Sequence, residues 1–313
     1  MTFLNTVKIV MANFSAVWKL LLYYIICAAV LFTVLYFAVS PVFDALKSAG
    51  VFQDLLNMIN SVFTGSSVAT QTDNAFSKAF SVLSSNVDMF AFHYVLIMLM
   101  LFIIIPFCFG LAELAIGEVL YGYMSSQTKY GFTRSFIGKV GKSCLLQLTK
   151  LLLLLPVNII VILEVYGILH LLAIGGIGLI FAAFLIILMT IVTLALKDTL
   201  FSCWMPAMLI LDIGPFKALR KSMGTVSRRF LKIFSTNLVL VLIMFSINLF
   251  FGLFTLLIAM VITIPLTTFV FTVSNMVEYF TGQGMKFYVT QGIVCEPKRM
   301  EEQDGIVRLK KIV

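Results

Sequence analysis

The most restrictive feature of this sequence is a series of long apolar runs that contain no charged residue. A helix needs about 20 apolar residues to cross roughly 30 Å of hydrocarbon, and residues 20–39 are uncharged over that length. Backbone polar groups inside a bilayer need internal partners, which leaves helices or closed barrels. Because the runs are continuous and do not alternate with polar residues, the sequence predicts an all-α integral membrane protein.

Six transmembrane helices account for these runs, and we predict that they form three helical hairpins in one membrane domain, residues 1–280. The composition agrees, since 61% of the residues are hydrophobic and 12% are charged, against about 45–50% and about 25% in ordinary soluble proteins. The predicted spans are residues 20–39, 89–112, 149–171, 176–196, 233–250 and 254–277.

The lysines and arginines predict the orientation of the chain, because cytoplasmic loops carry an excess of these residues. With both termini in the cytoplasm, all of them except Lys47 and Lys78 lie at or beside cytoplasmic ends. We therefore expect a multi-pass protein of the cell membrane. The same arrangement accounts for the net charge of +8, so no nucleic-acid partner is expected.

Two segments lie outside the predicted spans. In the outer loop, residues 40–87, apolar residues recur at helical spacing and predict two short helices joined by an exposed turn at residues 65–72. Their apolar faces could cap the helix bundle or lie in the outer headgroup region. Residues 281–313 are polar with mixed charge. They predict a cytoplasmic tail without fixed structure or, alternatively, a docking segment for a soluble partner.

A basic segment precedes each odd-numbered span, at residues 3–19, 132–150 and 216–232. We predict that each forms an amphipathic helix in the inner membrane interface. In the third segment the predicted apolar face comprises Phe216, Leu219, Met223, Val226 and Phe230. The basic residues either only set the orientation or also bind anionic phospholipid, at about 1 kcal/mol per charge. The predicted lipid-contact residues are Lys217, Arg220, Lys221, Arg228, Arg229 and Lys232.

The sequence FSCWMPAMLILD at residues 201–212 is followed by GPFKALRKS at residues 214–222 and by Arg228, Arg229 and Phe230. These stretches resemble a recurrent pattern in a large family of bacterial multi-pass membrane proteins. That family also supplies the membrane domain fused to some glycerophosphodiester phosphodiesterases. The resemblance covers residues 201–280, and it implies a bacterial origin and a six-helix fold more than an activity.

Glu164 lies in the outer half of the third predicted span. His170 follows it one to two turns later, and His93 lies at the outer end of the second span. Ionisable residues inside a membrane indicate functional sites by default, so these three are candidates for a polar intramembrane cluster. The alternative is that His93, Glu164 and His170 all lie at the outer interface and contact water or headgroups.

Glu113 and Glu118 lie near the inner end of the second predicted span. They are five residues apart and so do not share one helical stripe. Either they form ion pairs with basic residues of the following loop at the inner surface, or they act as a gate or a substrate contact in a cavity that opens to the cytoplasm. The basic residues of that loop are Lys129, Arg134 and Lys139.

Motifs for common catalytic chemistry are missing from the sequence. It contains no G-x-x-x-x-G-K, H-E-x-x-H or G-x-S-x-G pattern, so ATP-driven, metalloprotease and serine-hydrolase mechanisms lack their residues. The five cysteines are far apart and form no C-x-x-C pair. A disulfide framework or a metal site is therefore not expected, and we predict neither catalytic residues nor a cofactor.

The leading hypothesis is a non-enzymatic membrane protein, either an accessory subunit or a membrane-organising factor that contacts lipids and other membrane proteins. The alternative is a small-solute or lipid transporter with a polar path between the hairpins. A third hypothesis is a lipid-modifying enzyme whose acids and histidines converge in three dimensions. A continuous cavity lined by Glu113 or Glu164 would favour transport, and a closed bundle with an exposed intramembrane groove would favour partner or lipid binding. A histidine within hydrogen-bonding reach of a carboxylate in a cleft would favour catalysis.

Overall fold

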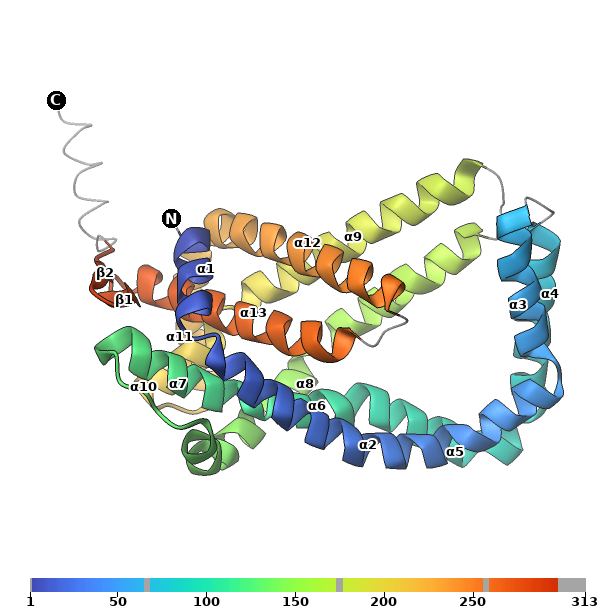
Figure 1. Cartoon of the computed structure of the whole chain (residues 1–313), viewed down its shortest axis with the longest axis horizontal. Helices are drawn as coiled ribbons and strands as arrows, with labels where there is room; N and C mark the ends of the chain where they lie inside the picture. Colours follow the sequence, from blue (N-terminus) through green and yellow to red (C-terminus); the bar gives the residue numbers. More distant parts are fainter. Residues whose placement is uncertain (1, 65–67, 173–176, 256–258, 298–313) are drawn as a thin grey trace. The chain divides into compact units, whose positions relative to one another are not determined.

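The computed structural model describes residues 2–64, 68–172, 177–255 and 259–297, and these are mostly helical (Figure 1). The helices are α1 (Thr2–Ala12), α2 (Ser15–Ser48), α3 (Val51–Thr64), α4 (Val68–Ser85), α5 (Val87–Leu99), α6 (Ile105–Gly110), α7 (Ala112–Ser126), α8 (Phe132–Leu172), α9 (Ile177–Phe201), α10 (Trp204–Leu211), α11 (Pro215–Arg228), α12 (Phe230–Phe254) and α13 (Met260–Gly282). A π-helical turn, η1 (Met100–Ile104), joins α5 to α6, and the strands are β1 (Phe287–Thr290) and β2 (Ile293–Cys295).

Six helical segments of the described chain are long and apolar enough to cross a membrane, as the sequence predicts. This number supports a multi-pass membrane protein, while the hairpin pairing and the orientation remain predictions. The six segments are Ser15–Ser48, Asp88–Ser126, Phe132–Val157, Ile187–Leu211, Phe230–Gly252 and Met260–Gly282.

Several helices continue beyond the ends of the predicted spans. α2 passes through Pro41 to Ser48, because one proline removes only one donor and other groups can satisfy the freed carbonyl. α7 extends the second span to Ser126. α4 already begins at Val68, inside the predicted exposed turn, and residues 65–67 of that turn lie outside the described part of the chain.

Only two of the three predicted interfacial segments form separate helices. α1 ends before α2 begins, and α11 ends before α12 begins. In contrast, α8 runs unbroken from Phe132 to Leu172. The prediction of a separate helix at residues 132–150 is therefore wrong. Residues 144–150 include leucine, glutamine and lysine, which are good helix formers, and no glycine or proline interrupts them.

Contacts divide the chain into two compact units. Unit 1 comprises Met1–Ile26, Phe107–Asn158 and Met189–Val313, and unit 2 comprises Cys27–Pro106 and Ile159–Leu188. Both clusters of buried hydrophobic residues found in the described part of the chain lie in unit 1.

Helix α13 is the central helix of unit 1 and contacts α1, α7, α10, α11 and α12. Its Phe269, Val273 and Met276 are fully buried. Trp204 of α10 is also fully buried, and its indole Nε1 donates a hydrogen bond to the carbonyl of Pro215 at 2.8 Å. Lipid tails are as apolar as leucine, so close van der Waals packing, rather than the hydrophobic effect, joins helices of this kind within a membrane.

The predicted tail is partly folded. β1 and β2 form an antiparallel hairpin in which Phe287 pairs with Cys295. Phe287 and Val289 are buried in the core of unit 1, and the ring centre of Phe287 lies 5.7 Å from that of Phe280 in α13. The expectation of a tail without fixed structure is wrong for residues 283–297, because alternate side chains of β1 reach the core. Residues 298–313 lie outside the described part of the chain.

Unit 2 contains α3, α4 and α5 with the adjoining parts of α2, α8 and α9. The loop predicted to hold two short helices does contain α3 and α4, which pack against each other. Lys78 of α4 forms an ion pair with Asp54 of α3 at 2.9 Å. The ring centre of Phe43 in α2 lies 4.6 Å from that of Phe52 in α3.

Candidate functional site

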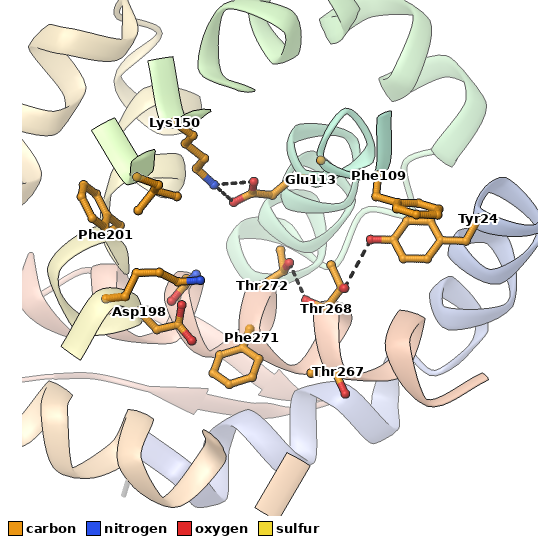
Figure 2. A pocket seen from close by; sticks show the side chains of 14 residues that line it. Tyr24, Phe109, Glu113, Lys150, Asp198, Phe201, Thr267, Thr268, Phe271 and Thr272 are labelled. Carbon is orange, nitrogen blue, oxygen red and sulfur yellow. Dashed lines mark hydrogen bonds and ion pairs between the residues drawn. The ribbon is translucent and has the colours of Figure 1, made fainter. Parts of the chain in front are cut away.

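A cavity of about 420 Å³ lies inside unit 1 (Figure 2). Its lining comes from α2, from α6 and α7, and from α8, α9 and α13, and every lining residue belongs to a candidate membrane span. Charged, hydroxyl and aromatic side chains dominate the lining. The four charged residues are Glu113, Lys150, Lys197 and Asp198.

An interruption between α6 and α7 shapes one wall of the cavity. Leu111 lies between the two helices, so carbonyl groups around it need partners from other helices. Ser143 of α8 donates a hydrogen bond to the carbonyl of Leu111 at 2.6 Å, and Gln147 donates to the carbonyl of Gly110 at 2.8 Å. These bonds hold α8 against the start of α7, where Glu113 lies.

Glu113 and Lys150 form an ion pair at this wall. Both carboxylate oxygens of Glu113 accept hydrogen bonds from the Lys150 ammonium, and Oε2 also accepts one from Nε2 of Gln147 at 3.0 Å. The side chains of Glu113 and Lys150 are 16% and 17% exposed. Charge-assisted hydrogen bonds are about twice as strong as neutral ones, so this network fixes both charges at the cavity surface.

Lys197 and Asp198 of α9 bring a second base and a second acid to the lining. Asp198 lies close enough to both members of the Glu113–Lys150 pair to interact with them electrostatically. In Figure 2 its carboxylate and the ion pair point into the same space. The described lining therefore holds two acids and two bases and carries no net formal charge.

Helix α13 supplies a polar wall made of Thr267, Thr268, Thr272 and Asn275. The three threonine hydroxyls donate hydrogen bonds to carbonyls of their own helix, at 2.8, 3.1 and 2.8 Å. Their O–H groups are therefore already used, and their oxygens can act only as acceptors. The oxygens of Thr267 and Thr268 already accept hydrogen bonds from Asn248 and Tyr24. Oδ1 of Asn275 is buried and accepts no hydrogen bond from a described residue. This wall offers acceptors to a ligand.

Aromatic rings cover much of the remaining lining, which includes Tyr24, Phe109, Phe201 and Phe271. The ring centres of Tyr24 and Phe109 lie 4.7 Å apart. The Tyr24 hydroxyl donates a hydrogen bond to Oγ1 of Thr268 at 3.3 Å, which joins α2 to α13. Such rings provide apolar contact area, and their negative faces attract cations.

Comparison of the chain with protein-family models, curated proteins and solved structures finds no match.

The two acids singled out by the sequence have different surroundings. Glu113 lines the cavity and is also ion-paired with Lys150, so its role as a gate or a substrate contact stays a prediction. Glu118 forms an ion pair with Lys139 at 3.7 Å, which is the arrangement expected of the alternative interpretation.

Three charged cavity residues, Lys150, Lys197 and Asp198, are not identified by hydropathy. By that criterion Lys150 marks the start of the third span and Lys197 the end of the fourth. In the structure α8 and α9 continue past these positions. The available signal is the lack of a helix breaker beside each charge, because lysine is a good helix former and ends an apolar run without ending a helix.

The predicted polar cluster falls in unit 2. His93 is half-buried among aromatic rings, and its ring centre lies 5.7 Å from that of Phe92 and 6.4 Å from that of Phe37. Glu164 is also half-buried. The side chain of His170 lies outside the described part of the structure, so the cluster of three stays a prediction.

Helix α11 exposes most of the predicted lipid-contact residues. The predicted apolar face is buried only in part: Val226 is buried, and Leu219 and Phe230 pack against the core. The other buried residues of α11 are Ala218, Ser222 and Thr225. Phe216 and Met223 are instead exposed, at 63% and 41%. Small side chains on the buried face allow α11 to lie close to its neighbours. The exposed basic residues are Lys217, Arg220, Lys221 and Arg228 of α11 and Lys232 at the start of α12.

Arg229 does not belong to this exposed surface. Its side chain is 11% exposed, and Nη1 lies 4.0 Å from Oε2 of the fully buried Glu278. Neither these two atoms nor Oε1 of Glu278 has a hydrogen bond of good geometry with a described residue. Lys232 and Thr236 lie close enough to act on the carboxylate. α11 ends at Arg228, and Arg229 leaves the helical conformation, so its side chain faces inward.

Asp212 follows α10, outside the candidate spans, and accepts a hydrogen bond from Lys142 of α8. This hydrogen bond and the positive charge of Lys142 hold the pKa of the Asp212 carboxyl below its ordinary value of 3.8. Both side chains are exposed, so solvent screens their attraction.

Proposed function

We propose that this chain is a non-enzymatic, multi-pass membrane protein that binds a small polar solute in the cavity of unit 1 and carries it across the membrane. One observation supports this proposal above the others. Two acids and two bases share a cavity of about 420 Å³ whose lining residues all belong to candidate membrane spans. Contact with lipid alone gives no reason to place four charges there.

The energetic cost of these charges favours a functional role. A charged side chain within a membrane helix is costly to insert, by up to about 2.5–3.5 kcal/mol at the helix centre, and such residues usually face a polar cavity or a partner. Ion pairing offsets part of this cost, yet replacing a buried pair with apolar residues is often neutral or stabilising. Stability alone therefore does not account for Glu113, Lys150, Lys197 and Asp198, whereas binding of a polar solute does.

The size of the cavity fits the same role. Small-molecule sites usually measure about 300–1,000 Å³ and combine apolar walls with a few convergent polar groups. Here the aromatic rings supply the apolar walls, and the four charges and the α13 wall supply the polar groups.

Uptake into proteoliposomes tests the proposal. Vesicles containing the purified protein are offered a mixture of isotope-labelled amino acids, sugars, polyols and carboxylates, and mass spectrometry measures what the washed vesicles retain. We expect uptake of at least one class above that of empty vesicles. The Glu113→Gln/Lys150→Met variant, whose cavity remains neutral, should lose this uptake because the fixed charges at the wall are gone.

A matched control is the Glu118→Gln/Lys139→Met variant, which makes the same two changes at an ion pair outside the cavity lining. It should transport like the unaltered protein. The proposal fails if the unaltered protein takes up nothing, or if both double variants transport equally well.

A second candidate function is contact with anionic lipid through α11, in an accessory or organising role beside other membrane proteins. It is favoured by the exposure of Phe216 and Met223 beside several basic side chains, the composition of a helix that lies in the membrane interface. Changing Lys217, Arg220, Lys221 and Arg228 to glutamine should reduce the amount of phosphatidylglycerol or cardiolipin that co-purifies. Unchanged lipid content in a folded variant would contradict this role.

A further inference from the structure

We propose that the cavity binds a small zwitterion. Its ammonium group lies against Asp198, Thr272 and Asn275, and its anionic group lies against Lys150 and Lys197. This inference rests on the proposed function, because it names the chemical class of solute for the same cavity.

The charge balance of the lining favours a zwitterion over a single ion. Glu113 and Asp198 oppose Lys150 and Lys197, so the lining is neutral before a ligand enters. A monovalent cation or anion would leave one uncompensated charge in a region of low dielectric, which is unfavourable. A zwitterion brings one charge of each sign and leaves the sum at zero.

The α13 wall matches an ammonium group. An ammonium has three N–H donors and no acceptor. Among the described residues, the Thr272 oxygen keeps its lone pairs while its O–H is bonded to the carbonyl of Thr268 at 2.8 Å. Oδ1 of Asn275 is buried without a donor, and the carboxylate of Asp198 faces the same cavity. Thr272, Asn275 and Asp198 thus each bring an acceptor to the lining of the same cavity.

The lining provides two lysines, Lys150 and Lys197, that can bind the anionic group of the ligand. Lys150 is held by Glu113, which Gln147 holds in turn at 3.0 Å, so its position does not depend on a ligand. Lys197 is the other basic residue of the lining, and it immediately precedes Asp198 in the sequence. Partners for both ends of a short zwitterion are therefore provided within one cavity. A carboxylate or a phosphate can accept hydrogen bonds from an ammonium group.

The aromatic part of the lining suits the same ligand. The ring faces of Tyr24 and Phe109 attract a cation within about 6 Å, and the rings give apolar area for the carbon part of the solute. A sugar or polyol carries about as many donors as acceptors and no charge, so it would make no use of the four charged residues.

Two sources could supply this chemistry, namely a free amino-acid-like solute and the phosphoethanolamine headgroup of a lipid. Both carry an ammonium and an anionic group a few bonds apart. Binding measured in detergent and in nanodiscs separates these two sources.

The first measurement is isothermal titration calorimetry of the full-length protein in dodecyl maltoside. The probes share a three-carbon skeleton and differ in charge: L-alanine is the zwitterion, propylamine the cation, propionate the anion and 1,2-propanediol the neutral compound. L-leucine and phosphoethanolamine extend the zwitterions in size and in anion chemistry. We expect at least one zwitterion to bind about tenfold or more tightly than each singly charged or neutral probe, which corresponds to about 1.4 kcal/mol.

The source of the ligand follows from which zwitterion binds. Binding of L-alanine or L-leucine in detergent indicates a free solute. Binding of phosphoethanolamine alone, together with a higher Tm in phosphatidylethanolamine nanodiscs than in phosphatidylglycerol nanodiscs, indicates a lipid headgroup. Either result supports a zwitterion site.

Two variants test whether the charges of the lining select the ligand. Each should change the relative affinity for charged probes, which a purely structural role of these residues would not change. Asp198→Asn leaves a lining with a net positive charge. The affinity for propionate relative to that for L-alanine should therefore rise about tenfold. Lys197→Met leaves a lining with a net negative charge, so the affinity for propylamine relative to that for L-alanine should rise to a similar extent. Glu118→Gln also removes one charge, but outside the lining, so it should leave the preference unchanged.

Three results would overturn the inference. Tighter binding of propylamine, propionate or 1,2-propanediol than of every zwitterion would reject the zwitterion class and leave solute binding in place. Uptake of a sugar or carboxylate into proteoliposomes, with no zwitterion bound, would likewise reject the zwitterion class and leave solute binding in place. No binding of any probe together with no uptake of any class would reject the proposed function as well.

Discussion

Two ion pairs of unit 1 place the same chemistry in different surroundings. Glu113 and Lys150 are 16% and 17% exposed, are joined by hydrogen bonds and line the cavity. Glu278 and Arg229 are 0% and 11% exposed, and their nearest charged atoms lie 4.0 Å apart. The first pair is accessible to a solute, whereas the second is enclosed where α11, α12 and α13 meet.

The comparison shows that burial, more than the presence of an ion pair, decides what each charge contributes. Glu113 has a second donor in Gln147 and faces a cavity that can hold water, so it keeps partners when one is removed. Glu278 is fully buried and depends on the cations around it. An enclosed charge that loses its partner is strongly unfavourable. We therefore propose a binding role for the first pair and structural support for the second.

The largest expected effect is that of Arg229→Met. It leaves the buried Glu278 without its nearest cation, and we expect the free energy of unfolding to fall by about 3–5 kcal/mol. Unfolding by sodium dodecyl sulfate in mixed micelles measures this change. The Arg229→Met/Glu278→Met variant should recover most of the loss, because both charges are removed together. A loss below about 1 kcal/mol in the single variant would show that Lys232 replaces Arg229, and that the enclosed pair is not essential.

A smaller effect is expected at the cavity pair. Lys150→Met leaves Glu113 with its hydrogen bond from Gln147, so the loss of stability should be about 1–3 kcal/mol. Uptake of solute should be lost at the same time. The same unfolding assay, run beside the proteoliposome assay, measures both. A loss as large as that of Arg229→Met would mean that the cavity pair is as enclosed as the other, which would remove the distinction.

A still smaller effect is expected for Glu118→Gln. Its partner Lys139 lies 3.7 Å away, and both side chains are 26% exposed. The change should cost less than about 1 kcal/mol, and added salt should reduce it further, because solvent and ions screen such pairs. Unfolding midpoints at low and high salt test this. A loss of stability that does not depend on salt would show that the Glu118–Lys139 pair is shielded from solvent, like the buried pairs.

The smallest effect is a dependence on acidic pH through Asp212. Its pKa is lowered in the folded state by Lys142, so the unfolded chain binds the proton more readily than the folded chain. The contribution to stability is therefore present above about pH 4 and is lost as the pH falls through the folded pKa. Asp212→Asn should remove this small acid-dependent change in Tm. An unchanged acid profile in the variant would show that other carboxyls account for it.

The sequence identifies part of the site and misses part of it, for a physical reason that Glu113 and Lys150 illustrate. Glu113 follows a long apolar run and stands out as an acid near a membrane span. Lys150 precedes a long apolar run, and by hydropathy it marks a membrane boundary. Only the position of α7 beside α8 shows that the two side chains meet in a cavity.

Arg229 and its neighbour Arg228 illustrate the same limit. Both are arginines next to the same apolar span, and nothing in their type separates them. The break between α11 and α12 turns one toward Glu278 and leaves the other exposed. The small residues that α11 buries are equally hidden from a hydropathy pattern, because close packing and not apolar character selects them.

The sequence alone determined that the chain contains six helices long and apolar enough to cross a membrane, and that helices occupy the loop at residues 40–87. Those properties depend on local composition, length and periodicity. The tertiary structure decided which charges meet, which of them line a cavity and which are enclosed. A helix carries side chains on all its faces, and only the arrangement of its neighbours determines which face meets lipid, a partner helix or a space open to a solute.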